Sequence, residues 1–140
     1  MSHAFSVIVL EDSDEDFETL KEAVAEPRRL RQVRRAVDGE ECLQLIDEER
    51  PALVLLDLNT PGMDGRDALL ALRADERLQC MPIVVLSTSS NPRDIAQCYA
   101  RGANAYHVKP VRYLDHLALV QAVLEYWFRW TLLAAEEETS

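Results

Sequence analysis

Short apolar runs alternate along the chain with segments in which apolar residues recur at helical spacing. The strongest runs are residues 7–10, 53–56 and 83–86, each apolar at every position, as in strands buried on both faces. Weaker runs at 33–36 and 105–108 indicate two further strands, the first carrying arginines as at a sheet edge. The pattern therefore predicts five strands.

Helical spacing fills the intervals between these runs. The predicted helices are one around 17–24 that closes at Pro27, one around 42–46, one around 68–72, one that opens at Asn91-Pro92 and is stopped by Gly102, and a long last one over about 113–133. Alternating strands and helices predict an α/β domain whose parallel sheet is covered on both faces. We expect a single domain over residues 1–135, with an extended C-terminal helix and an acidic tail at 136–140.

Composition and charge narrow the classes of partner. A chain of 140 residues suits one domain, and its net charge of −10 argues against binding to nucleic acid. No apolar run approaches the roughly 20 residues that span a membrane, and the N-terminus lacks a secretory signal, so a soluble cytoplasmic protein is expected. The basic segment from Arg28 to Arg35 is the local exception, as either a solvated edge or a docking site for an acidic partner.

Polar side chains directly follow four of the predicted strands. They are Asp12 with Glu11 before it, Asp57, Ser87 and Lys109. Because the carboxyl ends of parallel strands lie at one edge of the sheet, where ligands bind in such folds, we expect these side chains to converge.

The carboxylates in this group predict a cation site. Carboxylates about 4 Å apart repel by several kcal/mol at an effective dielectric near 20, so they must either protonate or share a cation. An all-oxygen set of this kind suits Mg²⁺. We expect Asp12 and Asp57 as direct ligands, Glu11 acting through water, and the backbone carbonyl of Asn59 completing the protein ligands.

Such a site gives Asp57 a chemical role. A carboxylate is a known nucleophile in phosphoryl transfer, and the metal and Lys109 would neutralise charge on the transferring group. Ser87 would donate a hydrogen bond to the phosphate once it is bound. Each residue also has a plain structural interpretation, since a lone acid or serine at a strand end is commonly a helix cap. Tyr106 alone suggests a half-buried strand aromatic, and the three histidines suggest surface or strand positions.

The last predicted helix carries more apolar surface than one core-facing stripe requires. Leu114, Leu117, Gln121 and Leu124 form the expected core stripe. The additional aromatic residues are Tyr126, Trp127, Phe128 and Trp130. They either fold back on the core or form an interface, for self-association or for docking of a kinase, and we favour the interface with a homodimer as the expected state.

Several motifs in sequence order resemble one known family. They are Val9-Leu10-Glu11-Asp12, Leu55-Leu56-Asp57-Leu58-Asn59, Pro61-Gly62-Met63-Asp64-Gly65, Leu86-Ser87, and Gly102-Ala103-Asn104-Ala105-Tyr106 leading to Lys109-Pro110. Over about residues 5–128 the chain resembles the response-regulator receiver domain of two-component signalling. The resemblance implies a doubly wound, flavodoxin-like five-stranded parallel sheet of order 2-1-3-4-5.

The resemblance also implies a mechanism. A histidine kinase would phosphorylate Asp57 with Mg²⁺ held at Glu11, Asp12 and Asp57, and the chain would catalyse only its own phosphorylation and dephosphorylation. Ser87 and Tyr106 would then move together and remodel the face formed by the fourth helix, fifth strand and fifth helix. The family also implies a cis peptide bond at Lys109-Pro110.

A narrower resemblance points to a kinase class. The stretches Leu58-Asn59-Thr60-Pro61-Gly62, Ser87-Thr88-Ser89-Ser90 and Leu124-Glu125-Tyr126-Trp127-Phe128 are similar to those of stand-alone regulators paired with bacterial phytochrome kinases. Two rival functions remain. A metal-dependent phosphatase would need a second acid where Asn59 stands, and a non-phosphorylated interaction module would not need Asp57 and Lys109.

Overall fold

The computed structural model describes residues 5–24, 30–131 and 133. Five parallel strands form one sheet of order β2-β1-β3-β4-β5, which confirms the predicted fold and strand order. The strands are β1 (Phe5–Leu10), β2 (Leu30–Ala36), β3 (Leu53–Leu56), β4 (Ile83–Ser87) and β5 (Ala105–Val108). The helices are α1 (Asp14–Val24), α2 (Gly39–Glu48), α3 (Gly65–Ala74), α4 (Pro92–Ala100) and α5 (Tyr113–Glu125), with a 3₁₀ turn at Glu76–Leu78 and a π-helical turn at Tyr126–Trp130.

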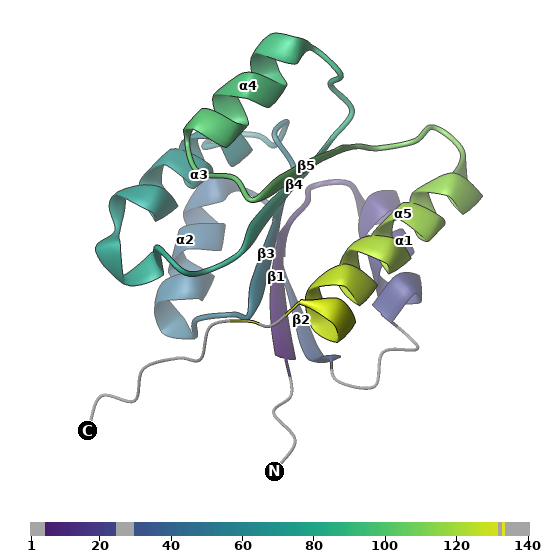
Figure 1. Cartoon of the computed structure of the whole chain (residues 1–140), viewed down its shortest axis with the longest axis horizontal. Coiled ribbons are helices and arrows are strands. Elements are labelled where there is room, and N and C mark those ends of the chain that lie inside the picture. Colours follow the sequence, from purple (N-terminus) through teal and green to yellow (C-terminus); the bar gives the residue numbers. More distant parts are fainter. Residues whose placement is uncertain (1–4, 25–29, 132, 134–140) are drawn as a thin grey trace.

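The helices form two layers, one on each face of the sheet. Figure 1 shows α1 and α5 on one side and α2, α3 and α4 on the other. Two hydrophobic clusters fill the spaces between helices and sheet, and successive strand residues alternate between them. In β1, Ile8 and Leu10 pack toward α2 and α3, whereas Val7 and Val9 pack toward α1 and α5. This alternation is the period-2 geometry of a strand buried on both faces.

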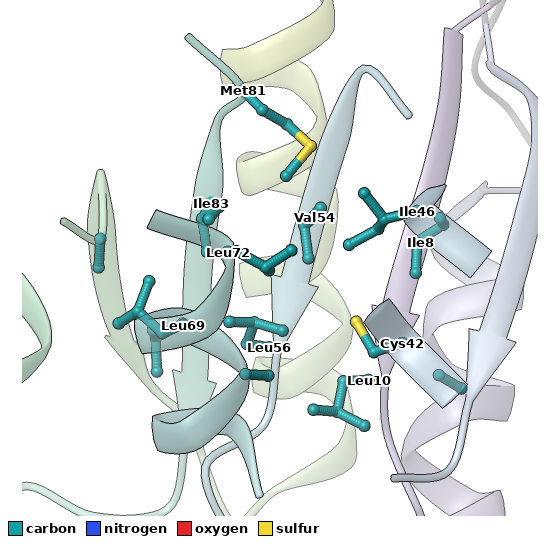
Figure 2. Close-up of a cluster of buried hydrophobic side chains, with 14 of the residues drawn as sticks. Ile8, Leu10, Cys42, Ile46, Val54, Leu56, Leu69, Leu72, Met81 and Ile83 are labelled. Carbon is teal, nitrogen blue, oxygen red and sulfur yellow. The ribbon is translucent and has the colours of Figure 1, made fainter. Parts of the chain in front are cut away.

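The cluster beneath α2, α3 and α4 contains most of the largest fully buried side chains. Figure 2 shows strand residues Ile8, Val54 and Ile83 facing Cys42 of α2 and Leu72 of α3. None of these side chains is more than 2% exposed. At about 25 cal/mol per Å² of apolar surface removed from water, this packing stabilises the sheet edge that holds the polar residues.

Local signals define several helix ends as the sequence predicts. The Asp64 side chain caps α3 by accepting hydrogen bonds from the amides of Arg66 and Asp67, and Asn91 caps α4 ahead of Pro92. Gly102 follows α4 with φ near +102°, a conformation that favours glycine.

The C-terminal helix differs from its prediction. Its regular part ends at Glu125 and the π-helical turn ends at Trp130, while residues 134–140, which include the expected acidic tail, lie outside the described residues. The predicted core stripe of this helix was wrong for two of its four residues, Leu114 and Gln121. Leu114 is 72% exposed and Gln121 is also exposed, whereas His116 and Val120 face the core.

The peptide bond between Lys109 and Pro110 also differs from what the resemblance implied. It is trans, as are all peptide bonds among the described residues. Trans is the lower-energy form of most X-Pro bonds. The Lys109 ammonium nevertheless reaches the carboxylates at the sheet edge.

Candidate functional site at the carboxyl edge of the sheet

The site begins where β1 and β3 end side by side. Leu10 pairs with Leu56 in the parallel register, so the next residues, Glu11 and Asp57, are neighbours. The amide of Asp57 donates to the Leu10 carbonyl at 3.0 Å. Both residues are buried at this edge of the sheet, with Glu11 5% and Asp57 8% exposed. Strand register therefore brings two carboxylates together from positions 46 residues apart in the printed sequence.

Hydrogen bonds fix both the carboxylate and the backbone carbonyl of Glu11. Its Oε2 atom accepts from the Ser13 amide at 3.2 Å, and its Oε1 atom accepts from the Lys109 ammonium at 2.7 Å. Arg35 of β2 donates from Nε to the Glu11 backbone carbonyl at 2.8 Å and pairs with Asp14 at 2.8 Å. These contacts fix the loop between β1 and α1 at the edge of the site.

Asp57 is fixed by its own loop and by the start of α3. One carboxylate oxygen accepts from the Asn59 amide at 3.0 Å. Gly65, the first residue of α3, packs on the Asp57 backbone so closely that a Cβ there would overlap the Asp57 carbonyl. The glycine is therefore required for close approach of helix and strand end.

Lys109 closes the site from the end of β5. Its buried ammonium donates to three carboxylates: Glu11 at 2.7 Å, Asp16 at 2.8 Å and Asp57 at 3.1 Å. Ser87 lies one strand away, at the end of β4, and its carbonyl accepts from the Lys109 amide at 2.8 Å. The Lys109 ammonium, which follows β5, therefore joins carboxylates that follow β1 and β3 to one in α1.

The charges at this edge perturb one another. Burial raises the pKa of Glu11 to about 7; the Lys109 ammonium lowers it, and the neighbouring Asp57 carboxylate raises it. Burial lowers the pKa of Lys109, but Glu11, Asp16 and Asp57 raise it by more, so the net direction is upward. The 2.7 Å contact with the charged Lys109 ammonium favours the ionised form of Glu11 and so limits the rise in its pKa. The edge is thus a buried ammonium surrounded by acids.

The carboxylates suit a divalent cation. Glu11, Asp12 and Asp57 each offer one oxygen, and these three oxygens lie within 4.8 Å of one another. Asp12 is exposed, so the cluster opens to solvent on its side. Oxygen donors with more than one negative charge are what Mg²⁺ and similar hard cations prefer. The donor set therefore fits the predicted metal.

The two expected switch residues, Ser87 and Tyr106, both form hydrogen bonds with Ser89. The Ser89 amide donates to the Ser87 hydroxyl at 3.1 Å, and the Tyr106 hydroxyl donates to the Ser89 carbonyl at 2.8 Å. Ser87 is fully buried, while Tyr106 is partly buried against the core. Both switch candidates therefore bond the same residue of the loop between β4 and α4.

The same loop is linked to the Asp57 loop through two residues that sequence reasoning missed. The Ser89 hydroxyl donates to Asp94 at 2.6 Å, and Asp94 pairs with Arg66 at 3.4 Å. Arg66 in turn donates to the Leu58 carbonyl, next to Asp57, at 3.4 Å. No local signal marks this chain of contacts, because it depends on how α3 and α4 lie beside each other.

Asp16 and Arg35 were also missed. Asp16 stands four residues after Asp12, a helical spacing that could have indicated a second acid on the same side of the loop and helix. Arg35 belonged to the basic segment that we expected to be solvated or to bind a partner; instead it holds the Glu11 backbone. His116 was expected at a surface or strand position, but it lies in α5 and is only 7% exposed, with Nδ1 3.8 Å from Asp16.

The four C-terminal aromatic residues divide between core and surface. Phe128 is 6% exposed and belongs to the cluster under α1 and α5, and Trp127 packs partly against it. Tyr126 and Trp130 are 57% and 69% exposed. The alternative in which the turn folds back on the core is therefore confirmed for Phe128, whereas the interface stays a prediction for the exposed Tyr126 and Trp130.

The fold and this edge define a class of protein. The chain belongs to the response regulator receiver domain family, which matches residues 7–123. Among curated relatives it is 29% identical over 136 residues to "Response regulator Rcp1" of Synechocystis sp., covering 92% of both chains. It is 39% identical over 80 residues to "Probable methanogenesis regulatory protein FilR2" of Methanothrix harundinacea, but spans only 52% of that protein.

Solved structures support the same relationship. The phosphorylated cyanobacterial phytochrome response regulator RcpA superposes with a TM-score of 0.90 at 32% identity, covering 94% of this chain and 99% of the other. The Mn²⁺-bound form of Rcp1 gives a TM-score of 0.89 at 28% identity, with the same coverage of both chains. The predicted family and the resemblance to stand-alone phytochrome regulators are both confirmed. None of the described helices is long and apolar enough to cross a membrane.

Proposed function

We propose that this receiver domain accepts a phosphoryl group on Asp57 from a histidine kinase and acts as a signalling switch. The observation that carries the proposal is the buried Lys109 ammonium, which donates to both Glu11 and Asp57 at the end of the central strands. A buried ammonium beside a carboxylate nucleophile supplies positive charge where a transferring phosphoryl group develops negative charge.

The reaction is a displacement at phosphorus. A carboxylate oxygen of Asp57 forms a bond to phosphorus, and the bond from phosphorus to the kinase histidine nitrogen breaks, with the electron pair remaining on the imidazole. Lys109 neutralises charge on the transferring group, and the Asn59 amide holds the other Asp57 oxygen in place. Glu11, Asp12, Asp57 and the Asn59 backbone carbonyl would hold Mg²⁺, which supplies further neutralisation of phosphoryl oxygens.

The readout uses Ser87, Ser89 and Tyr106. The Ser87 hydroxyl accepts a hydrogen bond from Ser89 and still has its own proton to donate, and a phosphoryl group on Asp57 would provide the acceptor. A shift of Ser87 toward the phosphate would move Ser89. That movement would change the hydrogen bond that the Tyr106 hydroxyl donates to the Ser89 carbonyl. The face formed by α4, β5 and α5 carries Tyr106 and would transmit the change.

The partners follow from the relatives and from the surface. RcpA is described as a phytochrome response regulator, which supports a phytochrome-type histidine kinase as the phosphoryl donor. The exposed rings of Tyr126 and Trp130 support self-association into a homodimer. Asp57 phosphorylation and hydrolysis are the only reactions we assign to the chain.

The test is intact-mass spectrometry after incubation with acetyl phosphate and Mg²⁺. We expect one phosphate adduct on the wild type and none on Asp57→Asn, which keeps the shape of the side chain but not its nucleophilic charge. Asp67→Asn, an exposed acid of α3, is the matched control and should be phosphorylated like the wild type. An adduct that persists on Asp57→Asn, or none on any of the three proteins, contradicts the proposal.

A further inference from the structure

Lys109 has one acceptor that the phosphoryl-transfer mechanism leaves unexplained. Besides Glu11 and Asp57, its ammonium donates to Asp16 Oδ2 at 2.8 Å. Glu11 and Asp57 follow strands, whereas Asp16 lies in the first turn of α1. Asp16 also lies outside the group of three carboxylates that could hold a metal ion. Its role therefore concerns Lys109 rather than the cation.

Asp16 is held in place from two directions. Its amide donates to the Ser13 hydroxyl at 3.2 Å, which ties it to the loop that carries Glu11. Its second carboxylate oxygen faces Nδ1 of buried His116 in α5 at 3.8 Å, which is contact distance but too long for a hydrogen bond. Because α1 packs against α5, Asp16 presents one oxygen to Lys109 and rests its other oxygen against a neighbouring helix.

The three hydrogen bonds use all three protons of the ammonium. A lysine ammonium has three donors, and the contacts to Glu11 and Asp16, at 2.7 and 2.8 Å, are shorter than the 3.1 Å contact to Asp57. Two firmly held protons leave the third directed at Asp57. Lysine is a flexible, rotatable point charge, so this direction has to be imposed by its surroundings.

The ion pair between Lys109 and Asp16 is largely shielded from solvent. The side chain of Lys109 is only 5% exposed and that of Asp16 is 28% exposed, so solvent screens the pair less than it screens a surface ion pair. Removing one partner of a buried ion pair costs more than breaking a surface one, because the remaining charge stays desolvated.

We propose that Asp16 is a positioning residue that aims the Lys109 ammonium at the phosphoryl group on Asp57. The inference rests on the proposed function. Without the Asp16 charge, Lys109 keeps Glu11 and Asp57 as acceptors, but the proton that Asp16 accepted is no longer held, and the ammonium spends less time in the productive orientation. The cation site loses no oxygen donor.

The experiment separates phosphorylation from metal binding in Asp16→Asn. We expect the initial rate with acetyl phosphate to fall about tenfold, while Mg²⁺ affinity by calorimetry stays within about twofold of the wild type. The matched control is Glu15→Gln, which removes one exposed charge from the same helical turn and should leave both quantities unchanged. Asp16→Glu restores the charge on a longer side chain and should be phosphorylated faster than Asp16→Asn.

A second readout reports on the ammonium itself. In ¹⁵N NMR the Lys109 ammonium, assigned by its absence in Lys109→Arg, should give a slowly exchanging signal in the wild type and in Glu15→Gln, and should broaden or vanish in Asp16→Asn. An equal phosphorylation rate or an unchanged ammonium signal in Asp16→Asn overturns the inference alone, as does an Asp16→Glu variant no faster than Asp16→Asn. A wild type that takes up no phosphate overturns the proposed function, and this inference with it.

Discussion

Two neighbouring acids at the end of β1 have opposite environments. Both carboxylate oxygens of Glu11 are bonded within the protein, to Lys109 and to the Ser13 amide. Asp12, the next residue, is exposed and completes the group of oxygens that lie within 4.8 Å of one another. Glu11 therefore anchors the loop, whereas Asp12 adds negative charge at the solvent side, where a cation would arrive.

The rise in the free energy of unfolding on Mg²⁺ binding should therefore depend on Asp12. A ligand at ten times its dissociation constant adds about 1.4 kcal/mol to the free energy of unfolding, or about 5 °C in melting temperature for a domain of this size. We expect that Mg²⁺-dependent rise in wild-type protein, measured by differential scanning fluorimetry, and a loss of most of it in Asp12→Asn.

The control for this measurement is Asp47→Asn, which removes an equally charged but remote side chain that is 78% exposed. It should keep the full Mg²⁺ response. Equal Mg²⁺ responses in Asp12→Asn and in the wild type would place the cation elsewhere.

At the scale of elements, α3 sets how closely the Asp57 loop is packed. Gly62 in this loop and Gly65 at the start of α3 differ in the reason for which glycine is needed. Gly62 has φ near +64° but open space around its missing Cβ, whereas a Cβ at Gly65 would overlap the Asp57 carbonyl. The first requirement is conformational and the second is steric.

These two requirements predict different outcomes for the same substitution. Gly62→Ala should lower the free energy of unfolding by about 1 kcal/mol, the usual cost of a left-handed conformation for a residue with a Cβ. Gly65→Ala should cost about 2–3 kcal/mol, because α3 must move away from the backbone of Asp57. It should also slow phosphorylation by acetyl phosphate.

Urea unfolding and intact-mass kinetics measure both quantities. Gly62→Ala serves as the matched control, and its phosphorylation rate should stay near that of the wild type. Equal destabilisation by the two variants would mean that α3 adjusts to the added methyl group without strain.

The C-terminal turn shows how an element can serve core and surface together. Phe128 is buried in the cluster under α1 and α5, while Tyr126 and Trp130 point away from it. Deleting the whole turn would therefore remove core packing along with the exposed rings, and burying a phenylalanine is worth several kcal/mol. Single exposed rings give the cleaner test of association.

At the scale of the whole molecule, the proposed homodimer depends on the exposed rings. We expect the double variant Tyr126→Ala and Trp130→Ala to shift the protein toward monomer in sedimentation velocity, because large aromatic side chains are frequent anchors of interfaces. Its melting temperature should change little, since both rings are more than half exposed.

The comparison variant is Leu70→Ala on α3, an apolar residue that is 53% exposed and lies in the other helical layer. It should sediment like the wild type. A double variant with an unchanged monomer-dimer profile would remove the turn from the dimer interface.

Much of the fold and of the candidate site could be predicted from local pattern. Fully apolar runs of only four residues, such as residues 53–56, favour interior strands when they alternate with helical segments, and the strand order followed from the family resemblance. The polar residues after these runs had to share one edge, because parallel strands all end on the same side. Glu11, Asp57 and Lys109 meet there for that reason.

Packing between elements decided the rest, since rotation of a helix about its axis and the pairing of helices leave little trace in local sequence. These non-local contacts turned Asp16 toward Lys109, buried His116 and Phe128, and left Leu114 exposed on a helix that is apolar on several sides. Strand ends converge through chain polarity, which local sequence encodes, whereas helix faces are selected by whichever neighbour buries them.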